Sequence, residues 1–265
     1  MNRRSFLANA GMAAGIIVAA PLLAEGKTDN ENPYDVTDLH VHTTPDFPME
    51  TIMQLSKERN VKFGIVDHPA EWAIKNDADM LAYINKLRQY PVYIGLQPMI
   101  SGWGKNFSPE VLAQLDYILM DPQTIPLGNG KYEFIWTLET YVENTEEFMK
   151  RYMEHSLNIL NNEPINIFGW PLFLPVCIAK DYYSIWTEER MQLIIQAAKS
   201  RNIAIEINDM AHTPHEDFII KAKKAGLKFT FGSDSRNNNA GRLAYCKEVA
   251  KKCNLTKNDF YVPVH

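Results

Sequence analysis

The sequence has little cysteine and no long run of basic residues, and both shortages exclude classes of function. Its three cysteines, Cys177, Cys246 and Cys253, are too few and too scattered for a disulfide framework or a thiolate zinc site. The formal net charge is −5, from 27 basic and 32 acidic residues, so binding to a nucleic-acid backbone has little electrostatic support. No Gly-x-Gly-x-x-Gly follows the first expected strand, which removes the main sign of dinucleotide binding. Because the chain is acidic overall and has no basic run, we expect no nucleic-acid partner.

Acidic residues are absent from the first 24 positions, which differ in composition from the rest of the chain. Arg3 and Arg4 precede Ser-Phe-Leu and an apolar run rich in alanine and glycine. Paired arginines before a short apolar stretch that ends in small residues are typical of a signal peptide, and Arg-Arg-x-Phe-Leu resembles the twin-arginine export signal. We expect cleavage after Ala24. The alternative is an uncleaved N-terminal membrane anchor.

Cleavage would remove two arginines and no acid, so the net charge would change from −5 to −7. The export signal implies the twin-arginine export machinery as a partner and a periplasmic or secreted location. Its cleavage implies no stable membrane span in the mature chain. Residues 25–33 are polar and are expected to form a loose leader. The twin-arginine pathway carries proteins that have already folded, often with a metal or cofactor bound, which favours a metal site.

Residues 34–265 are expected to form one domain, because short apolar runs alternate with amphipathic segments and no composition break interrupts them. Seven such alternations predict an α/β fold, a distorted TIM-like barrel of about seven β/α units, with an open doubly wound sheet as the alternative. Residues 123–141 depart from the pattern and predict a long loop or an added hairpin. The strands are expected at residues 36–41, 61–66, 92–96, 117–120, 165–168, 203–207 and 228–231, and the helices at 50–60, 77–89, 109–114, 143–162, 187–201, 214–225 and 240–252.

Histidines and an aspartate stand where three of the expected strands end. His40 and His42 are two residues apart on the first strand and should therefore point to the same face. His68 follows the second strand, and Asp234 follows the last. Because ligands gather at the carboxyl ends of barrel strands, and imidazole suits zinc, iron and manganese, these residues predict a metal or catalytic site.

Three stretches carry a resemblance to a known family. Residues 38–43 (DLHVHT), 66–68 (VDH) and 232–235 (GSDS) resemble the first, second and last motifs of the PHP (polymerase and histidinol phosphatase) family. The resemblance spans residues from about 34 to 252. It implies a distorted barrel of seven β/α units, two or three bound divalent metals, and hydrolysis of phosphoesters by metal-activated water. His40, His42, His68 and Asp234 match family metal ligands.

Other family positions have changed in this chain. Gln97 stands where the resemblance leads us to expect a bridging glutamate, and residues 121–123 (DPQ) lack the histidine expected after the fourth strand. Trp170 and Arg236 replace two further histidines. A neutral amide bridges two cations less well than a carboxylate, and a permanent guanidinium repels a metal. We therefore expect at most one divalent ion (zinc, manganese or iron), held by His40, His42 and Asp234 with help from Gln97 or solvent, and a metal-free descendant stays open.

Four residues are candidates for substrate binding or catalysis. Arg236 could grip an anionic group of the substrate and stabilise developing charge, or it could form a salt bridge to Asp234 or Asp67. Gln97 is also assigned to substrate binding. His212, in the loop after the sixth strand, could act as a proton donor, whereas His215, His155 and His265 are expected to have no part in the site. Trp170 could contribute, with Trp103 and Trp136, to an aromatic wall, the alternative being core packing.

The first functional hypothesis is an exported metal-dependent hydrolase of a small-molecule phosphoester, the resemblance supplying the reaction class. The second is a catalytically inactive PHP-like domain that binds a small or carbohydrate-like ligand in the same pocket. The third is another metal-dependent hydrolysis, such as amide cleavage, which would use the same residues. We also expect His155 at the surface of its helix, and Cys246 and Cys253 as buried apolar residues of theirs.

Overall fold

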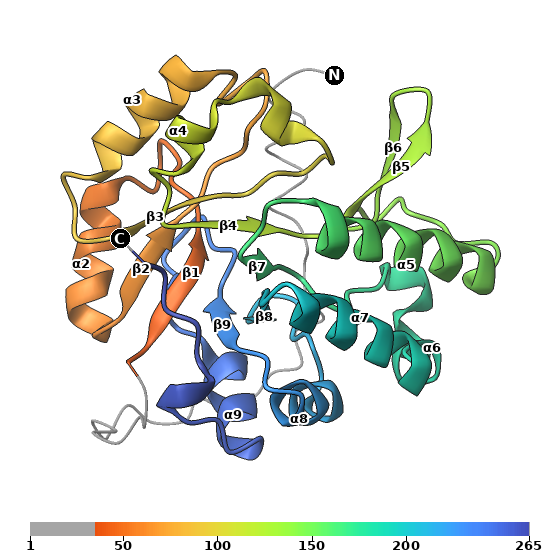
Figure 1. Cartoon of the computed structure of the whole chain (residues 1–265). Coiled ribbons are helices and arrows are strands. Elements are labelled where there is room, and N and C mark those ends of the chain that lie inside the picture. The colour runs from red at the N-terminus through yellow and green to blue at the C-terminus, as the bar shows by residue number, and fades with distance from the viewer. Residues whose placement is uncertain (1–34, 265) are drawn as a thin grey trace.

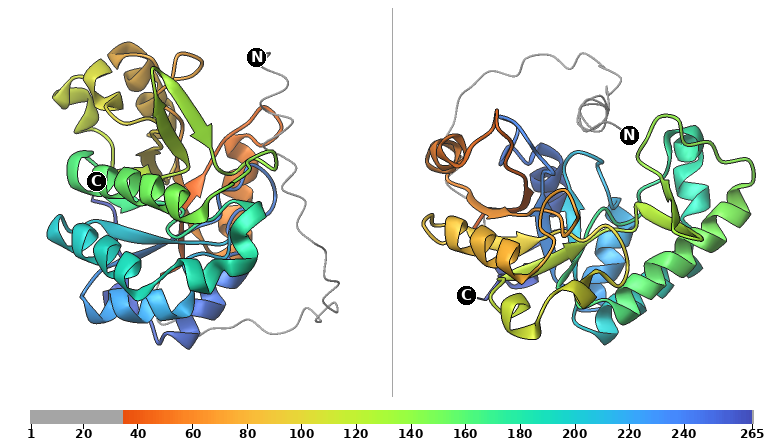
Figure 2. Two further views of the ribbon diagram at one scale, coloured as in Figure 1. Left: turned by 90° about the vertical axis from the view of Figure 1, so that its right-hand side faces the viewer. Right: turned by 90° about the horizontal axis from the view of Figure 1, so that it is seen from above.

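Seven parallel strands form the centre of the protein, as seen in the computed structural model, which describes residues 35–264 (Figure 1). The expected signal peptide and the leader at residues 25–33 lie outside the described residues. Each strand pairs in parallel with its neighbour, and helices follow the strands around the outside (Figure 2). The order is β1 (Thr37–Val41), β2 (Lys62–Ile65), β3 (Tyr93–Leu96), β4 (Tyr117–Met120), β7 (Ile167–Phe168), β8 (Ala204–Asn208) and β9 (Phe229–Gly232).

The first strand and the segment after the last strand meet and nearly close the sheet into a barrel. The His42 N–H donates to the Ser235 carbonyl over 3.0 Å, and Val41 and Ser235 form a parallel bridge. Asp38 accepts hydrogen bonds from the Ser233 N–H at 2.9 Å and the Gly241 N–H at 2.8 Å. We call this junction of residues 38–42 with residues 233–241 the seam. The α/β class and the TIM-like barrel predicted from the sequence are confirmed.

Helices surround the barrel, and several begin at a residue that caps their free N–H groups. Asn76 accepts hydrogen bonds from the first turn of α3, Asn144 does so for α5, and Thr187 caps α7. The main helices are α2 (Met49–Arg59), α3 (Asp77–Leu87), α4 (Pro109–Leu112), α5 (Thr145–Asn162), α6 (Tyr182–Ile185), α7 (Glu188–Ser200), α8 (Glu216–Lys224) and α9 (Ala244–Lys252), with 3₁₀ turns η1 (Trp103–Asn106), η2 (Val176–Asp181) and η3 (Lys257–Asp259).

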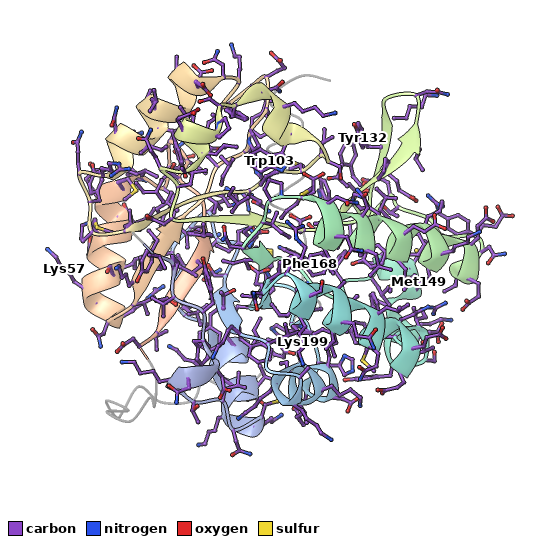
Figure 3. The ribbon with its side chains drawn as sticks, in the orientation of Figure 1. Lys57, Trp103, Tyr132, Met149, Phe168 and Lys199 are labelled. Carbon is purple, nitrogen blue, oxygen red and sulfur yellow. The ribbon has the colours of Figure 1, made fainter. Side chains whose placement is uncertain are left out.

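Two apolar layers hold the fold together. The outer layer lies between strands and helices: Phe168 of β7 and Met149 of α5 are both fully buried there, whereas Lys57 on α2 points outward (Figure 3). The inner layer fills the barrel, where Tyr117 packs beside Leu39 and donates a hydrogen bond to its carbonyl at 2.7 Å. A Cβ at position 64 or 95 would lie within 2.4 Å of Tyr117, so both strands need glycine beside this ring.

A hairpin departs from the β/α alternation. Strands β5 (Thr124–Gly128) and β6 (Lys131–Phe134) pair antiparallel after β4 and project from the barrel at the upper right of Figure 1. Gly128, Asn129 and Gly130 turn the chain, all with positive φ. The sequence left a long loop and an added hairpin open for residues 123–141, and the structure has the hairpin. Among the described residues, no helix has the length and apolar character needed to cross a membrane.

One expectation about the helices was wrong. His155 was expected at the surface of its helix, but it is 5% exposed and faces the barrel side of α5 with Tyr152 and Ile159. Glu154 and Ser156, its polar neighbours in the sequence, suggested a solvated position, yet the helical repeat places residue 155 on the buried face. Cys246 and Cys253 are buried, as expected.

Candidate metal centre

Two imidazoles and a carboxylate converge at the carboxyl end of the barrel. The Nε2 atoms of His40 and His42 lie 3.3 Å and 3.2 Å from the same atom, Oδ1 of Asp234. All three residues are buried, and they form a group that could hold a metal ion. Neither Nε2 atom has a hydrogen-bond partner of acceptable geometry. Buried polar atoms without partners are uncommon, so this arrangement fits a metal ion that these atoms would coordinate.

A β-bulge in the first strand sets the direction of these histidines. The pairing of β1 with β2 shifts register between Asp38 and Val41. Asp38 bonds to the backbone of Gly241 outside the barrel, Leu39 packs inside, and His40 also reaches the interior. Bulges commonly redirect side chains beside functional sites. From His40 onward the two-residue alternation holds, and His42 joins His40 at the mouth of the barrel.

Glu206 orients His40 from strand β8, which lies beyond β9 from β1. Its Oε1 lies 2.6 Å from Nδ1 of His40, and its Oε2 accepts hydrogen bonds from the Trp170 N–H at 2.7 Å and the Asn208 amide at 3.1 Å. A carboxylate can only accept here, so Nδ1 carries the proton and Nε2 is the atom free to bind a metal. The sequence predicted no role for Glu206. The available signal was an acid in the middle of a buried strand, where a carboxylate needs a partner.

Arg236 lies against the same carboxylate. Its guanidinium donates to Oδ1 of Asp234 at 2.7 Å and to the Asp234 carbonyl at 3.2 Å. Of the two salt bridges that the sequence left open, the structure forms the one with Asp234. Asp234 itself has a positive φ of 46°, a conformation that non-glycine residues rarely adopt. Oδ1 of Asp234 therefore faces three cationic or potentially cationic groups at once.

The charges around the cluster move the pKa values of its members apart. Burial opposes protonation of His40, but the carboxylates of Asp234 and Glu206 outweigh it and raise the pKa of His40 to about 9. Burial, with Arg236 nearby, lowers the pKa of His42 well below its usual value. Burial alone would raise the pKa of Asp234, yet Arg236 and His40 hold that pKa well below its usual range. A metal ion would take the place of the second proton on His40.

His68 stands next to this group but is not one of its three converging residues. Its ring stacks on His42 with centroids 5.1 Å apart and meets the edge of Trp72 at 5.4 Å. Its Nδ1 donates to the Gln97 carbonyl at 2.8 Å, which leaves Nε2 unprotonated in the neutral ring. Burial lowers the pKa of His68 to about 4. His68 is thus a neighbour of the His40, His42 and Asp234 cluster, and its role as a ligand stays a prediction.

Gln97 is engaged by an acid that the sequence prediction did not use. Its side-chain amide donates to Oδ2 of Asp121 at 2.9 Å, while its Oε1 has no partner. Oδ1 of Asp121 accepts from the Gln123 N–H at 3.0 Å. Burial raises the pKa of Asp121 to about 6, although these hydrogen bonds oppose the rise. Gln97 and Asp121 end the adjacent strands β3 and β4, so a substrate group at the barrel mouth would meet a neutral amide beside a carboxyl.

The three tryptophans for which the sequence left an aromatic wall or core packing open pack against different neighbours. Trp170 meets Phe173, Trp103 meets Phe107, and Trp136 meets Phe134. Figure 3 shows Trp103 in the upper half of the molecule, apart from β7, which Trp170 follows. Trp170 is 7% exposed and its Nε1 has no partner, so it stays a candidate for substrate contact.

His212 has its contacts elsewhere. Its exposed ring stacks on Tyr245 of α9, with centroids 4.7 Å apart and planes 7° from parallel. Together with His215 it lines a groove beside α6 and α8 rather than joining the group of His40, His42 and Asp234. Its assignment as a proton donor stays a prediction that this geometry does not favour.

Comparisons with known proteins leave the family open. No family model matches the chain, and no curated protein sequence matches it. A chain in a cryo-EM structure of archaeal ribonuclease P with mature tRNA is similar at 14% identity, over 82% of this chain and 89% of that one, with a TM-score of 0.39. A similarity this low carries no argument about fold or function.

Proposed function

We propose that this protein is a metal-dependent hydrolase that uses one divalent ion held by His40, His42 and Asp234. The observation that carries the proposal is the convergence of two unpartnered Nε2 atoms on one buried carboxylate oxygen. Zinc, manganese or iron fits two imidazoles and a carboxylate with open positions. When bound, such an ion lowers the pKa of water and polarises the bond to be cleaved.

The residues around the ion have separate parts in this proposal. Glu206 fixes the tautomer and direction of His40, and its buried carboxylate stabilises positive charge on that ring. Arg236 is half-exposed at the mouth, and it could turn from Asp234 toward an anionic substrate group. Gln97 and Trp170 offer an unpartnered acceptor and an unpartnered donor for orienting the substrate.

Phosphoesters are the substrate class that we propose, on the strength of the PHP resemblance of residues 38–43, 66–68 and 232–235. Arg236 supports it, because a guanidinium matches the geometry of a phosphate. The twin-arginine pattern at Arg3 and Arg4 supports export to the periplasm or beyond, and these residues lie outside the described part of the chain. Replacing both arginines by lysine should retain the protein in the cytoplasm.

Metal analysis of the purified mature protein tests the proposal. We expect one equivalent of metal in the natural protein, none in His40→Ala or Asp234→Ala, and an unchanged content in the control His215→Ala, whose histidine lies outside the cluster. Hydrolysis of p-nitrophenyl phosphate should follow metal content. A protein that takes up no metal from zinc, manganese or iron would contradict the proposal.

A second candidate function rests on the ion pair between Arg236 and Asp234. The guanidinium already neutralises the carboxylate that a metal needs, so the barrel could serve as a metal-free binding domain for a small ligand. This alternative expects a folded protein without metal and without hydrolysis. The metal analysis above separates the two.

A further inference from the structure

A groove lies on the protein, apart from the His40, His42 and Asp234 cluster. It has a volume of about 840 Å³. One side is formed by η2, α6 and the start of α7, and the other by the loop that leads into α8. These segments follow β7 and β8, so the groove is at the carboxyl end of the barrel, on the side of α6 and α8 in Figure 1. We call it the tyrosine groove.

Aromatic rings make up its walls. Tyr182, Tyr183 and His215 meet edge to face in a triangle with centroids 5.3–5.4 Å apart. On α9, Tyr245 carries the ring of His212 stacked flat upon it. Tyr183 is 78% exposed, an unusual position for a large ring that already has two aromatic partners. The groove therefore presents flat, partly apolar faces to solvent, the surface that a ligand ring can stack on.

Two buried polar atoms of the lining residues have no partner. Nε1 of Trp186 is a hydrogen-bond donor, and Oγ1 of Thr213 is both donor and acceptor. Their residues are 2% and 4% exposed. Unpaired polar groups at this depth cost folding free energy, and a bound molecule or ordered water commonly satisfies them. The ligand of this groove should therefore bring hydroxyl groups.

Two lysines partly neutralise three acids at the rim of the groove. Glu188 and Asp217 both pair with Lys221, at 3.2 Å and 2.6 Å, and Glu216 pairs with Lys252 at 2.9 Å. Each acid that lines the groove thus already has a cationic partner. Because two lysines serve three acids, the rim keeps a small negative charge that disfavours an anion, and its carboxylate oxygens suit a ligand with hydroxyl donors.

We propose that the tyrosine groove binds a neutral sugar ring, as a free saccharide or as part of a glycan. A pyranose has an apolar C–H face for the phenol rings of Tyr182 and Tyr183 and hydroxyl groups for Trp186 and Thr213. The paired carboxylates at the rim can accept further hydroxyl hydrogen bonds. None of these residues belongs to the metal cluster, so the proposal stands apart from the proposed hydrolase activity.

Isothermal titration of the mature protein with cellotetraose, xylotetraose, maltotetraose and chitotetraose tests this. At least one should bind, equally well with and without EDTA. Tyr183→Ala should weaken the binding about tenfold or more, because the exposed ring supplies stacking area without supporting the core. Trp186→Phe, which keeps a ring but removes the N–H, should also weaken it. Leu193→Ala, an exposed position on α7 outside the groove, is the matched control and should change nothing.

Binding of none of the four oligosaccharides at 10 mM would overturn the proposal. So would binding that Tyr183→Ala leaves unchanged, since the sugar would then occupy another surface. Tetramethylammonium chloride is the competing probe. If it binds in a Tyr183-dependent way and the sugars do not, the groove is a cation cage and the sugar proposal is wrong.

Discussion

At the scale of single residues, Arg236 governs how readily the candidate site can take a cation. Its guanidinium lies 2.7 Å from the oxygen of Asp234 that also faces His40 and His42. A metal ion coordinated by that oxygen has to displace Arg236 and then tolerate a positive charge nearby. Since the side chain is 35% exposed, it has room to move into solvent.

Replacing Arg236 by glutamine should therefore tighten metal binding. We expect the Kd for Zn²⁺ at pH 7.5 to fall by about tenfold to a hundredfold, because a competitor and a repelling charge are both removed. Titration calorimetry of the metal-free protein measures it. Arg242→Gln, an exposed arginine on the same loop, is the matched control and should leave the Kd unchanged. Equal affinities in all three proteins would show that Arg236 does not compete.

His155 predicts a loss of stability in mild acid. Burial lowers its pKa from 6.5 to about 4, so the folded protein binds this proton less readily than the unfolded chain does. The contribution of His155 to the free energy of unfolding is complete above pH 6.5. It declines as the pH falls toward 4, by up to about 3 kcal/mol. Urea unfolding at pH 7 and pH 4 should show a smaller decline in His155→Gln than in the natural protein. Equal declines would contradict the assignment.

The sequence predicted the residues at the centre of the candidate site but not Glu206, which orients one of them. His40, His42, His68 and Asp234 stand at strand ends, and a two-residue repeat suffices to place such residues together. Glu206 has the same kind of position, yet its role depends on which histidine nitrogen it meets across strands, and only tertiary structure fixes that. The place of His212 could not be read from the sequence for a related reason: a loop residue after a strand can turn in either direction, and this one turns onto Tyr245.

At the scale of elements, β9 approaches β8 and β1 so closely at Gly232 that no side chain fits. A Cβ there would lie 1.9 Å from Oε1 of Glu206 and 2.9 Å from the Cβ of His40. Gly232→Ala must therefore move Glu206 off Nδ1 of His40 or open the strands.

We expect Gly232→Ala to lower the free energy of unfolding by about 1–3 kcal/mol and to weaken Zn²⁺ binding about tenfold. Urea unfolding and calorimetry measure the two effects. Gly104→Ala is the control, because no atom lies within 4 Å of a Cβ at that position. If Gly232→Ala binds zinc as well as the natural protein does, Glu206 does not orient His40.

All seven strands and all seven helical segments expected from the sequence are present, although the segment at 109–114 is only the four-residue α4. Buried strands between amphipathic helices leave a regular pattern. Short elements left no such pattern. The 3₁₀ turns η1 and η2 and the four-residue α6 are too brief for a helical repeat, and their positions follow from packing on the barrel. For residues 123–141 the sequence left a long loop and a hairpin open, because Gly-Asn-Gly permits either.

At the scale of the whole molecule, the seam joins the two ends of the sheet, and the candidate ligands come from both sides of it. His40 lies in β1, His42 directly follows it, and Asp234 follows β9. A bound ion would therefore link the two sides of the seam, where the parallel pairing is a single bridge between Val41 and Ser235. Asp38 contributes to the same junction through its bonds to Ser233 and Gly241.

Metal should thus stabilise the whole fold. At a free zinc concentration of one hundred times the Kd, we expect about 2.7 kcal/mol of added stability and a rise in Tm of about 5–10 °C. Thermal scans with zinc and with EDTA measure it, and hydrogen exchange should show the gain first at the amides of His42 and Ser235. Asp234→Ala should show no zinc-dependent rise. A rise of equal size in that variant would place the metal elsewhere.

The seam also bears on when the site can exist during synthesis. Residues 40 and 234 lie far apart in the chain, so a ribosome has made most of the protein before the last ligand emerges. A stalled or clipped product that ends before β9 would have both histidines and still lack the carboxylate between them. Possession of a bound ion would then mark a finished molecule, a property that a cell could use to separate complete chains from fragments.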